Sequence, residues 1–433
     1  MTKKYSKDLL TFIEQSSSVF HNIKEIKKRL FKHGYQELEE KDSWTLEKGS
    51  SYFTTRNNSS IIAFHIGKEM KESHFQITAA HSDSPTFKLK AKPVLTSKKD
   101  YLVANIESYG GMIDYSWFDR PLSLSGRVFV DKKDRVDEIL LSIEKDLFLI
   151  PSVAIHMGLE NKGEWNIQKD LLPLISCGKV EENDFLDYIA KEVGSSKEDL
   201  LSFDLYLVNR QKGSIWGLEE EFISSPKLDD LQCVYSSLQA LLESKDEKHI
   251  NVFAVFDNEE VGSLTKQAAM STFLRDSLQR IHTSFASCSL QETLAKSFMV
   301  SCDNAHAIHP NHPELSDPMN FPQMNKGIVI KENSQQKYMT DAFSRAVFTK
   351  LCKDAHVPYQ TYANRSDKKG GSTLGNLATV HTSIQGIDIG LSQLAMHSSY
   401  ETAGSLDTDY MICALKEFFN RNILLFSHAF TIE

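Results

Sequence analysis

The sequence has few cysteines, and none of them stand close together. Among its 433 residues there are six, at positions 177, 233, 288, 302, 352 and 413, and no two form a Cys-x-x-Cys pair. Small secreted domains that depend on disulfides are much richer in cysteine. The sequence therefore does not encode a disulfide framework, and we expect a protein of the reducing cytoplasm.

Long apolar runs are also lacking. No segment approaches the roughly 20 consecutive apolar residues that a membrane-spanning helix requires. The N-terminal segment begins with lysines, but Asp8, Glu14 and Gln15 interrupt its apolar stretch, so it does not resemble a signal peptide. We therefore expect neither membrane insertion nor secretion.

The chain has no excess of positive charge. Its 49 Lys and Arg residues are outnumbered by 58 Asp and Glu residues, which gives a formal net charge of -9. Because nucleic-acid-binding domains usually carry a basic patch, nucleic acid is not an expected partner. The hydrophobic fraction of 41%, with 20 Gly and 11 Pro, is that of a globular protein and excludes disordered, collagen-like and coiled-coil chains.

The length and the changing character of the sequence indicate two domains. At roughly 150 residues per domain, the chain is long enough for two or three domains, or for one large α/β domain with an insertion. Residues 91–221 contain β-leaning runs separated by turns, and we predict that they form an inserted β-rich domain. Residues 1–90 and 222–433 are predicted to form the main domain.

Helical segments and buried strands alternate after residue 225. The segment LDDLQCVYSSLQALLES has helical spacing, and the continuous apolar strand INVFAVF follows it and ends in acidic residues. This alternation predicts an α/β fold with a mixed, mostly parallel sheet flanked by helices on both faces. In such folds, ligands bind beyond the carboxyl ends of the strands.

Acidic and imidazole side chains recur at the ends of the predicted strands and helices. They fall in five segments, which contain His81 and Asp83; Asp229 and Asp230; Asp257, Glu259 and Glu260; Asp303, His306 and His309; and His397. A single histidine or aspartate in such a place is usually a cap or a hydrogen-bonded surface residue. The three carboxylates after INVFAVF are harder to explain in this way, because like charges in a semi-buried site are costly without a cation or a proton.

Together these residues have the composition of a catalytic metal site. Nitrogen and oxygen ligands without thiolate suit Zn, Mn or Co in an open catalytic site. Two histidines and three carboxylates would be enough for two ions that each have one histidine and one carboxylate and that share a bridging carboxylate. Because paired ions about 3.5–4 Å apart are a common hydrolytic device, we expect two divalent ions, zinc first and Mn or Co as alternatives.

Seven motifs occur in the order and approximate spacing of a known family. They are ITAAHSDSP, SPKLDDL, FDNEEVGS, SCDNAHAIHPNH, KENSQQKY, RSDKKGGSTLG and LSQLAMHS. With them the sequence resembles the aspartyl aminopeptidase family of co-catalytic zinc metallopeptidases, which also contains vacuolar aminopeptidase I. The resemblance runs from about His81 to Ser398, and it includes YGGMIDYSWFDRPLSLSGRV and IPSVAIHM in the predicted insertion.

The resemblance implies a zinc-peptidase-like catalytic domain with two metal ions. Asp229 would bridge the ions. His81 and Asp303 would complete one metal site, and Glu260 and His397 would complete the other.

The resemblance also assigns the catalytic groups. Glu259 would be the general base that takes a proton from a water activated by the two ions, and Asp83 would orient His81. The ions would also hold the free α-amino group, which confines cleavage to the first residue. The implied reaction removes the N-terminal residue of peptides, with acidic residues as the first expectation and neutral residues as an alternative.

Further residues match family positions for substrate binding and assembly. His306, Lys331 and Tyr338 would line the substrate site, where Lys331 would supply positive charge for an acidic side chain or the bound carbonyl. His156 matches a family histidine that reaches into the active site of a neighbouring subunit. By the same resemblance, residues 91–221 form a dimer, and dimers assemble into a tetrahedral homo-oligomer of twelve subunits. An isolated lysine or histidine is more often an ordinary surface or structural residue, so these assignments depend on the resemblance.

The sequence departs from its relatives at positions that bear on the substrate. Asp230 stands where relatives similar to the animal enzyme have Asn, and Lys368 and Lys369 lie in RSDKKGGSTLG, which replaces their RNDMPCGST loop. The two lysines would either favour acidic substrates or lie in solvent, where most lysine pairs lie. The metal ligands show no departure.

Two other functions fit part of the pattern. Related di-metal folds deacylate small N-acyl substrates, and a non-catalytic assembly protein would keep the shell without the chemistry. However, YGGMIDYSWFDR and AIHM resemble the dodecamer-forming insertion rather than a deacylase lid, and Glu259 and all five candidate ligands are present. We therefore expect a cytoplasmic metallo-aminopeptidase that acts on peptides and has no membrane or nucleic-acid partner.

Overall fold

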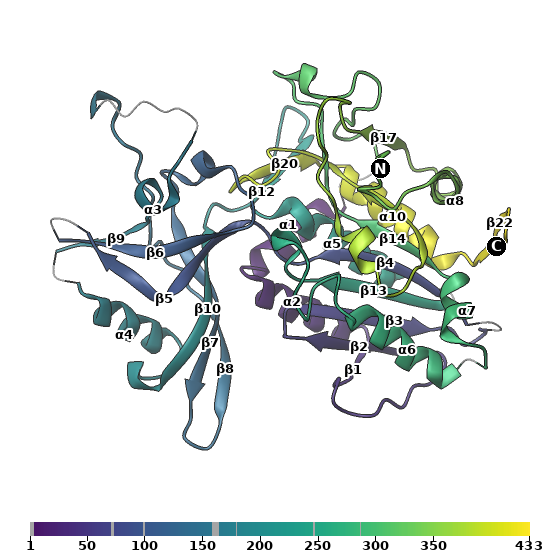
Figure 1. The fold of residues 1–433 in the computed structure, drawn as a ribbon, viewed down its shortest axis with the longest axis horizontal. Helices are drawn as coiled ribbons and strands as arrows, with labels where there is room; N and C mark the ends of the chain where they lie inside the picture. The colour runs from purple at the N-terminus through teal and green to yellow at the C-terminus, as the bar shows by residue number, and fades with distance from the viewer. Residues whose placement is uncertain are drawn as a thin grey trace.

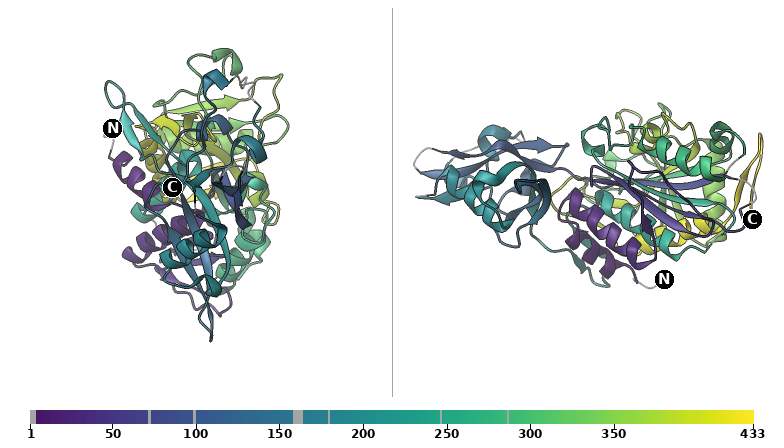
Figure 2. Two further views of the ribbon diagram at one scale, coloured as in Figure 1. Left: turned by 90° about the vertical axis from the view of Figure 1, so that its left-hand side faces the viewer. Right: turned by 90° about the horizontal axis from the view of Figure 1, so that it is seen from below.

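The chain forms two lobes, each built around its own β-sheet (Figure 1). The computed structural model describes residues 4–70, 73–97, 100–157, 164–178, 180–245, 247–285 and 287–433. The larger lobe contains a nine-stranded sheet and the smaller lobe a six-stranded sheet. Figure 2 shows the smaller lobe projecting from one end of the larger one.

The nine-stranded sheet is mixed, as the sequence predicts. Its order is β1 (Gln36–Glu37), β2 (Ser51–Arg56), β3 (Ser60–Ile66), β13 (Ile250–Phe256), β4 (Phe75–His81), β14 (Phe298–Cys302), β18 (Gln385–Gly390), β16 (Ile328–Glu332) and β17 (Tyr359–Ala363). The four central strands, from β13 to β18, run parallel to one another. Antiparallel pairs flank them, at β2 with β3, β3 with β13 and β18 with β16. The predicted α/β class with a mostly parallel sheet is confirmed.

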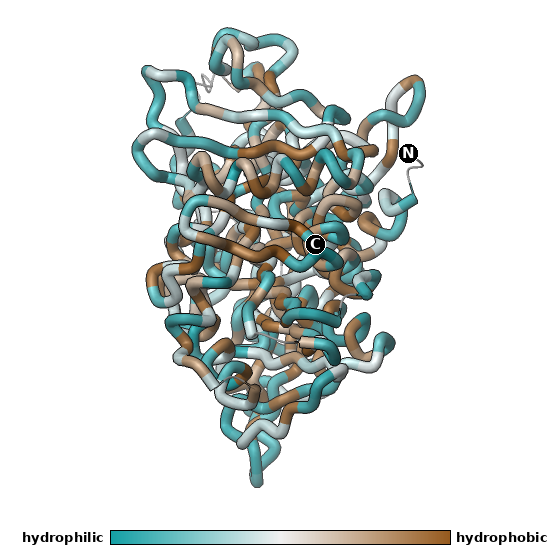
Figure 3. The backbone as a smooth tube through the Cα atoms, turned by 90° about the vertical axis from the view of Figure 1, so that its right-hand side faces the viewer, coloured by the Kyte–Doolittle hydropathy of each residue, from teal (hydrophilic) through white to brown (hydrophobic). Residues whose placement is uncertain are grey.

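Helices cover both faces of this sheet. One face packs against α1 (Ser6–Gln15), α2 (Val19–Lys32), α5 (Leu228–Glu243), α8 (Ala342–Asp354) and α10 (Asp407–Asn420). The other face packs against α6 (Phe273–Phe285), α7 (Leu290–Ala295) and α9 (Leu374–Ala378). Because both faces are covered, β4 and β13 are buried along their entire length, which explains the unbroken apolar run INVFAVF. Figure 3 shows hydrophobic segments inside the molecule and hydrophilic loops at its outside.

The smaller lobe is built on an antiparallel sheet. Its order is β8 (Val136–Ser142), β7 (Leu122–Asp131), β10 (Leu200–Asn209), β5 (Thr86–Thr96), β6 (Tyr101–Tyr109) and β9 (Leu174–Cys177). The lobe also contains η1 (Asp114–Trp117), η2 (Ile155–Met157), α3 (Ile167–Asp170), α4 (Glu182–Glu192) and η3 (Lys197–Asp199). It has its own hydrophobic core, in which Phe87 packs edge-on against Trp117 at a ring distance of 5.3 Å.

A third sheet in the larger lobe is formed by short strands from distant parts of the sequence. Its five strands are β11 (Ser214–Trp216), β12 (Phe222–Ser225), β20 (Glu401–Gly404), β19 (Ser392–Leu394) and β15 (Ala305–His306). The remaining elements are η4 (Glu259–Val261), η5 (Pro313–Leu315) and the hairpin of β21 (Ile423–Leu425) with β22 (Phe430–Ile432). No helix in the described part of the chain is both long and apolar enough to cross a membrane.

Candidate active site

Three polar segments meet at the carboxyl ends of central strands of the nine-stranded sheet. β4 ends on His81, β13 leads through Asp257 into η4, and Asp303 follows β14. Because β13, β4 and β14 are parallel neighbours, with Phe256 opposite His81, their carboxyl ends lie side by side. The sheet topology therefore brings together side chains that are far apart in the sequence.

Two more predicted ligands come from outside this sheet, and Glu401 joins them. Asp229 lies at the start of α5, and His397 follows β19 with a left-handed φ of 66°. Glu401 Oε2 accepts the backbone N–H of Asp229 at 3.0 Å, and its Oε1 accepts the N–H of His397 at 2.7 Å. Glu401 is only 2% exposed, and its burial, together with repulsion from Asp229, raises its pKa to about 8. No motif in the sequence identifies Glu401 as part of the site.

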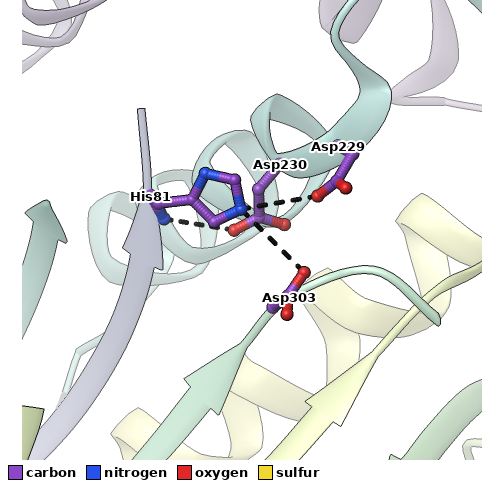
Figure 4. Close-up of side chains that lie close together, drawn as sticks. All are labelled: His81, Asp229, Asp230 and Asp303. Atoms are coloured by element: carbon purple, nitrogen blue, oxygen red, sulfur yellow. Dashed lines mark hydrogen bonds and ion pairs between the residues drawn. The ribbon is translucent and has the colours of Figure 1, made fainter. Parts of the chain in front are cut away.

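Asp229 directs one carboxylate oxygen toward each of two histidines. Its Oδ1 lies 3.4 Å from His81 Nε2, and its Oδ2 lies 3.4 Å from His397 Nε2. His81 Nε2 is also 3.9 Å from Asp303 Oδ1, and His397 Nε2 is 3.4 Å from Glu260 Oε2. Figure 4 shows the His81 ring directed toward Asp229 and Asp303. The five predicted ligands thus form two groups that share Asp229.

The spacing of these atoms fits metal coordination. A tetrahedral zinc with bonds of about 2.0–2.1 Å holds its ligand atoms about 3.3–3.4 Å apart. Three of the four distances above are 3.4 Å. Asp229 Oδ1 and Glu260 Oε1 are both buried, and neither accepts a hydrogen bond of good geometry from the described residues. Since a buried carboxylate oxygen requires a donor or a cation, the residues present fit metal binding.

The charge of the cluster also favours cations. Burial and the nearby Asp229 raise the pKa of Glu260 well above its ordinary value. Burial also raises the pKa of Glu259 to about 7, and neighbouring carboxylates add to this effect. Burial opposes ionisation of Asp229 as well, but its contacts with the two histidines lower its pKa. The protein therefore supplies less positive charge here than the carboxylates need, and divalent ions would supply the remainder.

Asp83 contacts both His81 and the turn that carries the two glutamates. The backbone carbonyl oxygen of Asp83 is 3.0 Å from His81 Nδ1, and the side-chain oxygen Oδ1 of Asp83 is 3.5 Å from the same nitrogen. Asp83 Oδ1 accepts the N–H of Glu259 at 3.1 Å, and Oδ2 accepts the N–H of Glu260 at 3.2 Å. Asp230, fully buried nearby, accepts the backbone N–H of His81 at 3.2 Å.

Lys331, Tyr338 and His306 lie beside the Asp303 side of the cluster. Lys331 Nζ is 3.1 Å from Asp303 Oδ2 and 5.6 Å from the centre of the Tyr338 ring. Tyr362, which the sequence analysis did not identify, has its ring 6.3 Å from that of His306 and 6.5 Å from that of Tyr338. Burial lowers the pKa of Lys331, but Asp303 more than offsets this effect and raises it above its ordinary value. A buried cation therefore lies next to a candidate metal ligand.

The candidate metal groups of the described chain do not include His156, His309, Lys368 or Lys369, all of which were considered from the sequence. His156 is exposed on η2 in the smaller lobe, and His309 is exposed after β15. Lys368 and Lys369 are exposed in the loop after β17, where Lys368 lines a polar groove. The structure of a single chain thus does not bring His156 to the metal groups.

The fold and the paired groups define an α/β metallohydrolase with its site at the carboxyl ends of parallel strands. A family model described as "Aminopeptidase I zinc metalloprotease (M18)" matches residues 12–419. The chain belongs to this M18 family, and it is a metallo-aminopeptidase. The resemblance stated from the motifs is confirmed.

Individual relatives agree with this assignment. The chain is 44% identical over 427 residues to a probable M18 family aminopeptidase 2 of Clostridium novyi, which covers 96% of this chain and 99% of the relative. It is 38% identical over 449 residues to aspartyl aminopeptidase 1 of Schizosaccharomyces pombe, with coverage of 96% and 95%. Among solved structures, the mApe1 dodecamer of S. cerevisiae is similar, with a TM-score of 0.85, 26% identity and 96% coverage of each chain.

Replacement of Glu401 tests whether its contacts support the metal site. In Glu401→Gln, an amide NH₂ would face a backbone N–H, so one of the two contacts to Asp229 and His397 would be lost. We expect zinc to bind about 10- to 100-fold more weakly, as is usual when a group that holds metal ligands is altered. Competition with a chromogenic chelator measures this change.

The matched control is Glu243→Gln at the other end of α5. Glu243 is half-buried and accepts hydrogen bonds from Tyr5 and Gln239, both at 2.8 Å. We expect this variant to bind zinc like the unaltered protein. Equal zinc affinity in the Glu401 and Glu243 variants would contradict the supporting role of Glu401.

Proposed function

We propose that this aminopeptidase releases the N-terminal residue of peptides with two divalent ions, zinc first and Mn or Co as alternatives. His81 and Asp303 would hold one ion, Glu260 and His397 the other, and Asp229 would be shared. The observation that carries this proposal is that the two oxygens of Asp229 face two separate histidines, each at 3.4 Å. When bound, such ions lower the pKa of a water and polarise the scissile carbonyl.

Glu259 is the general base in this proposal. Its carboxylate lies with His81 and Glu260 in a group whose candidate ligand atoms are within 4.8 Å of one another, but it is in neither of the groups that contain Asp229. A base with a pKa near 7 is well matched to proton transfer at neutral pH. Glu259 would take a proton from the attacking water and deliver it to the leaving amine. Asp83 would hold the Glu259 backbone through the 3.1 Å hydrogen bond.

Glu259→Gln is expected to keep its metal ions and lose nearly all turnover. The amide cannot accept the proton, so kcat should fall by at least about 100-fold. Turnover of a chromogenic aminoacyl substrate and metal content by mass spectrometry give the two values. Glu198→Gln, at an exposed glutamate of the smaller lobe, is the control and should retain full turnover. Substantial turnover by Glu259→Gln at full metal occupancy would remove this base from the mechanism.

We infer a preference for acidic N-terminal residues. Lys331 is only 3% exposed and its ammonium group uses one contact, at 3.1 Å, for Asp303. An ammonium group has three N–H donors, so it can also contact a substrate carboxylate or the bound carbonyl oxygen. His306 and Tyr338 would form further parts of the pocket. The relative in S. pombe that is named an aspartyl aminopeptidase supports this preference.

A substrate panel tests the reaction and its selectivity. We expect Asp- and Glu-p-nitroanilide to be cleaved with a kcat/KM at least about 10-fold above that of Leu- and Met-p-nitroanilide. A chelator should abolish release, and re-added Zn, Mn or Co should restore it. N-acetyl-Asp-p-nitroanilide, which lacks a free α-amino group, should not react.

Each other outcome of the panel identifies a different error. Preferred release of Leu or Met would contradict the acidic pocket and leave the mechanism intact. Cleavage of the N-acyl bond of N-acyl substrates, without cleavage of substrates that have a free α-amino group, would favour a deacylase. Absence of release with every metal would contradict the proposed reaction.

We propose that the protein is a homo-oligomer, in which residues 91–221 form dimers that assemble into a dodecamer. The structure named as an mApe1 dodecamer supports this assembly. In addition, Ile155 and Met157, on either side of His156, are 89% and 76% exposed. Exposed apolar side chains of this kind are typical of an interface. His156 would then reach the active site of a neighbouring copy.

His156→Ala should reduce kcat/KM by at least about 10-fold, the order seen when one stabilising group is removed, while metal content and assembly are unchanged. Sedimentation should show twelve copies of the 49.1 kDa chain for both proteins. Co-expression with Glu259→Gln provides a stricter test. In mixed oligomers, intact His156 of the second variant would serve active sites of the first, so activity should partly return. An unaffected His156→Ala enzyme, or no recovery on mixing, would contradict the cross-subunit role.

We propose the cytoplasm as the place of action. All six cysteines lie in the described residues and are free. Free thiols of this number are typical of a reducing compartment.

A further inference from the structure

Tyr109 links the smaller lobe to the metal site. It is the last residue of β6 and pairs with Thr86 of β5. Thr86 comes three residues after Asp83 in the sequence. The Tyr109 hydroxyl donates a hydrogen bond to Asp83 Oδ2 at 2.8 Å. It also accepts one from Asn258 Nδ2 at 2.8 Å. One hydroxyl therefore contacts both segments that flank the predicted general base.

The contact with Asp83 affects several site residues at once. The Asp83 carboxylate lies 3.5 Å from His81 and accepts the backbone N–H groups of Glu259 and Glu260 at 3.1 and 3.2 Å. The hydrogen bond from Tyr109, at 2.8 Å, has the ordinary length of an O–H···O bond, and hydrogen bonds to a carboxylate are of the stronger kind. Without it, the hydrogen bond from Glu260 is the one that Asp83 Oδ2 keeps among the described residues, and the carboxylate has more freedom to rotate.

The contact with Asn258 fixes the direction of the hydroxyl. Asn258 adopts a left-handed φ of 63° at the turn between β13 and η4. Its Oδ1 accepts hydrogen bonds from Thr265 Oγ1 at 2.7 Å and Gln267 Nε2 at 2.8 Å, which orients its Nδ2 toward Tyr109. Because the Tyr109 oxygen accepts from Asn258, its own proton is left to donate to Asp83.

The surroundings hold the ring and the following backbone in place. The Tyr109 ring packs edge-on against Tyr206, with 5.6 Å between ring centres and an interplanar angle of 81°. Gly110 follows with φ 77°, and a Cβ there would lie 3.1 Å from Glu260 Cβ, so the backbone passes close to that predicted ligand. Burial and the charges of Asp83 and Asp257 raise the pKa of Tyr109, so the hydroxyl remains protonated.

We propose that Tyr109 is a positioning residue of the active site. Its hydroxyl fixes the Asp83 carboxylate, and through Asp83 it fixes the His81 ring and the η4 turn that carries Glu259 and Glu260. This role rests on the proposed two-ion function, because Tyr109 acts on the groups that hold the metals and the base. It makes the end of β6, a strand of the smaller lobe, a functional part of the catalytic site.

Tyr109→Phe removes the hydroxyl and keeps the ring. We expect kcat at saturating zinc to fall by about 10- to 100-fold, with KM within about twofold, and zinc affinity to fall at least about 10-fold, as for other residues that orient metal ligands. The matched control is Tyr235→Phe. The Tyr235 hydroxyl also donates to a carboxylate, Asp8 Oδ2, at 2.8 Å, but neither residue belongs to a candidate metal group. This control should leave kcat and zinc affinity unchanged.

A double-mutant cycle tests the route through Asp83. If Tyr109 acts through Asp83, Tyr109→Phe should cost at most about twofold in zinc affinity in an Asp83→Asn background, because coupled residues are non-additive. Equal costs in both backgrounds, or unaltered kcat and zinc affinity in the single Tyr109 variant, would overturn the proposal. So would an equal loss from Tyr235→Phe. Failure of the two-ion function would instead appear in the unaltered protein, as fewer than two zinc ions bound per chain.

Discussion

The concentration of buried carboxylates around Asp229 is the constraint on which the rest of the site depends. Burial and repulsion between like charges both oppose ionisation here, and together they raise the pKa of Glu260 well above its ordinary value. The protein compensates only part of it, with the two histidines that face Asp229 and with Lys331 beside Asp303. The cluster is therefore built for bound cations, and its five predicted ligands form two groups around one shared carboxylate.

The scaffold holds this unfavourable arrangement in place. Three segments with predicted ligands extend from neighbouring parallel strands, whose faces are covered by helices on both sides. Asp229 and His397 come from α5 and the five-stranded sheet, and Glu401 joins their backbones. Asp83 likewise accepts the backbone N–H groups of Glu259 and Glu260 in the η4 turn. In both places, a buried acidic side chain accepts two backbone N–H groups and so fixes residues that have ligand or base roles in the proposed mechanism.

Much of the fold and of the candidate site could be predicted because the strand ends carry the chemistry. A buried apolar run followed by acidic residues, as in INVFAVFDNEE, identifies both a central strand and its polar tip. The residues that support these tips were not apparent. Glu401 contacts Asp229 across 172 positions, and Asn258 contacts Tyr109 across 149, so their roles depend on spatial neighbours that no linear pattern reveals. Glu401, the first residue of β20, is otherwise one more acidic residue in the sequence.

Anomalous diffraction from crystals of the zinc-loaded protein, recorded on both sides of the zinc absorption edge, tests whether two ions share Asp229. The account predicts two zinc peaks about 3.5–4 Å apart, one next to each carboxylate oxygen of Asp229. One peak should lie beside His81 and Asp303, and the other beside Glu260 and His397. A single peak at full loading, or two peaks with Asp229 bound to only one of them, would contradict the shared-carboxylate site.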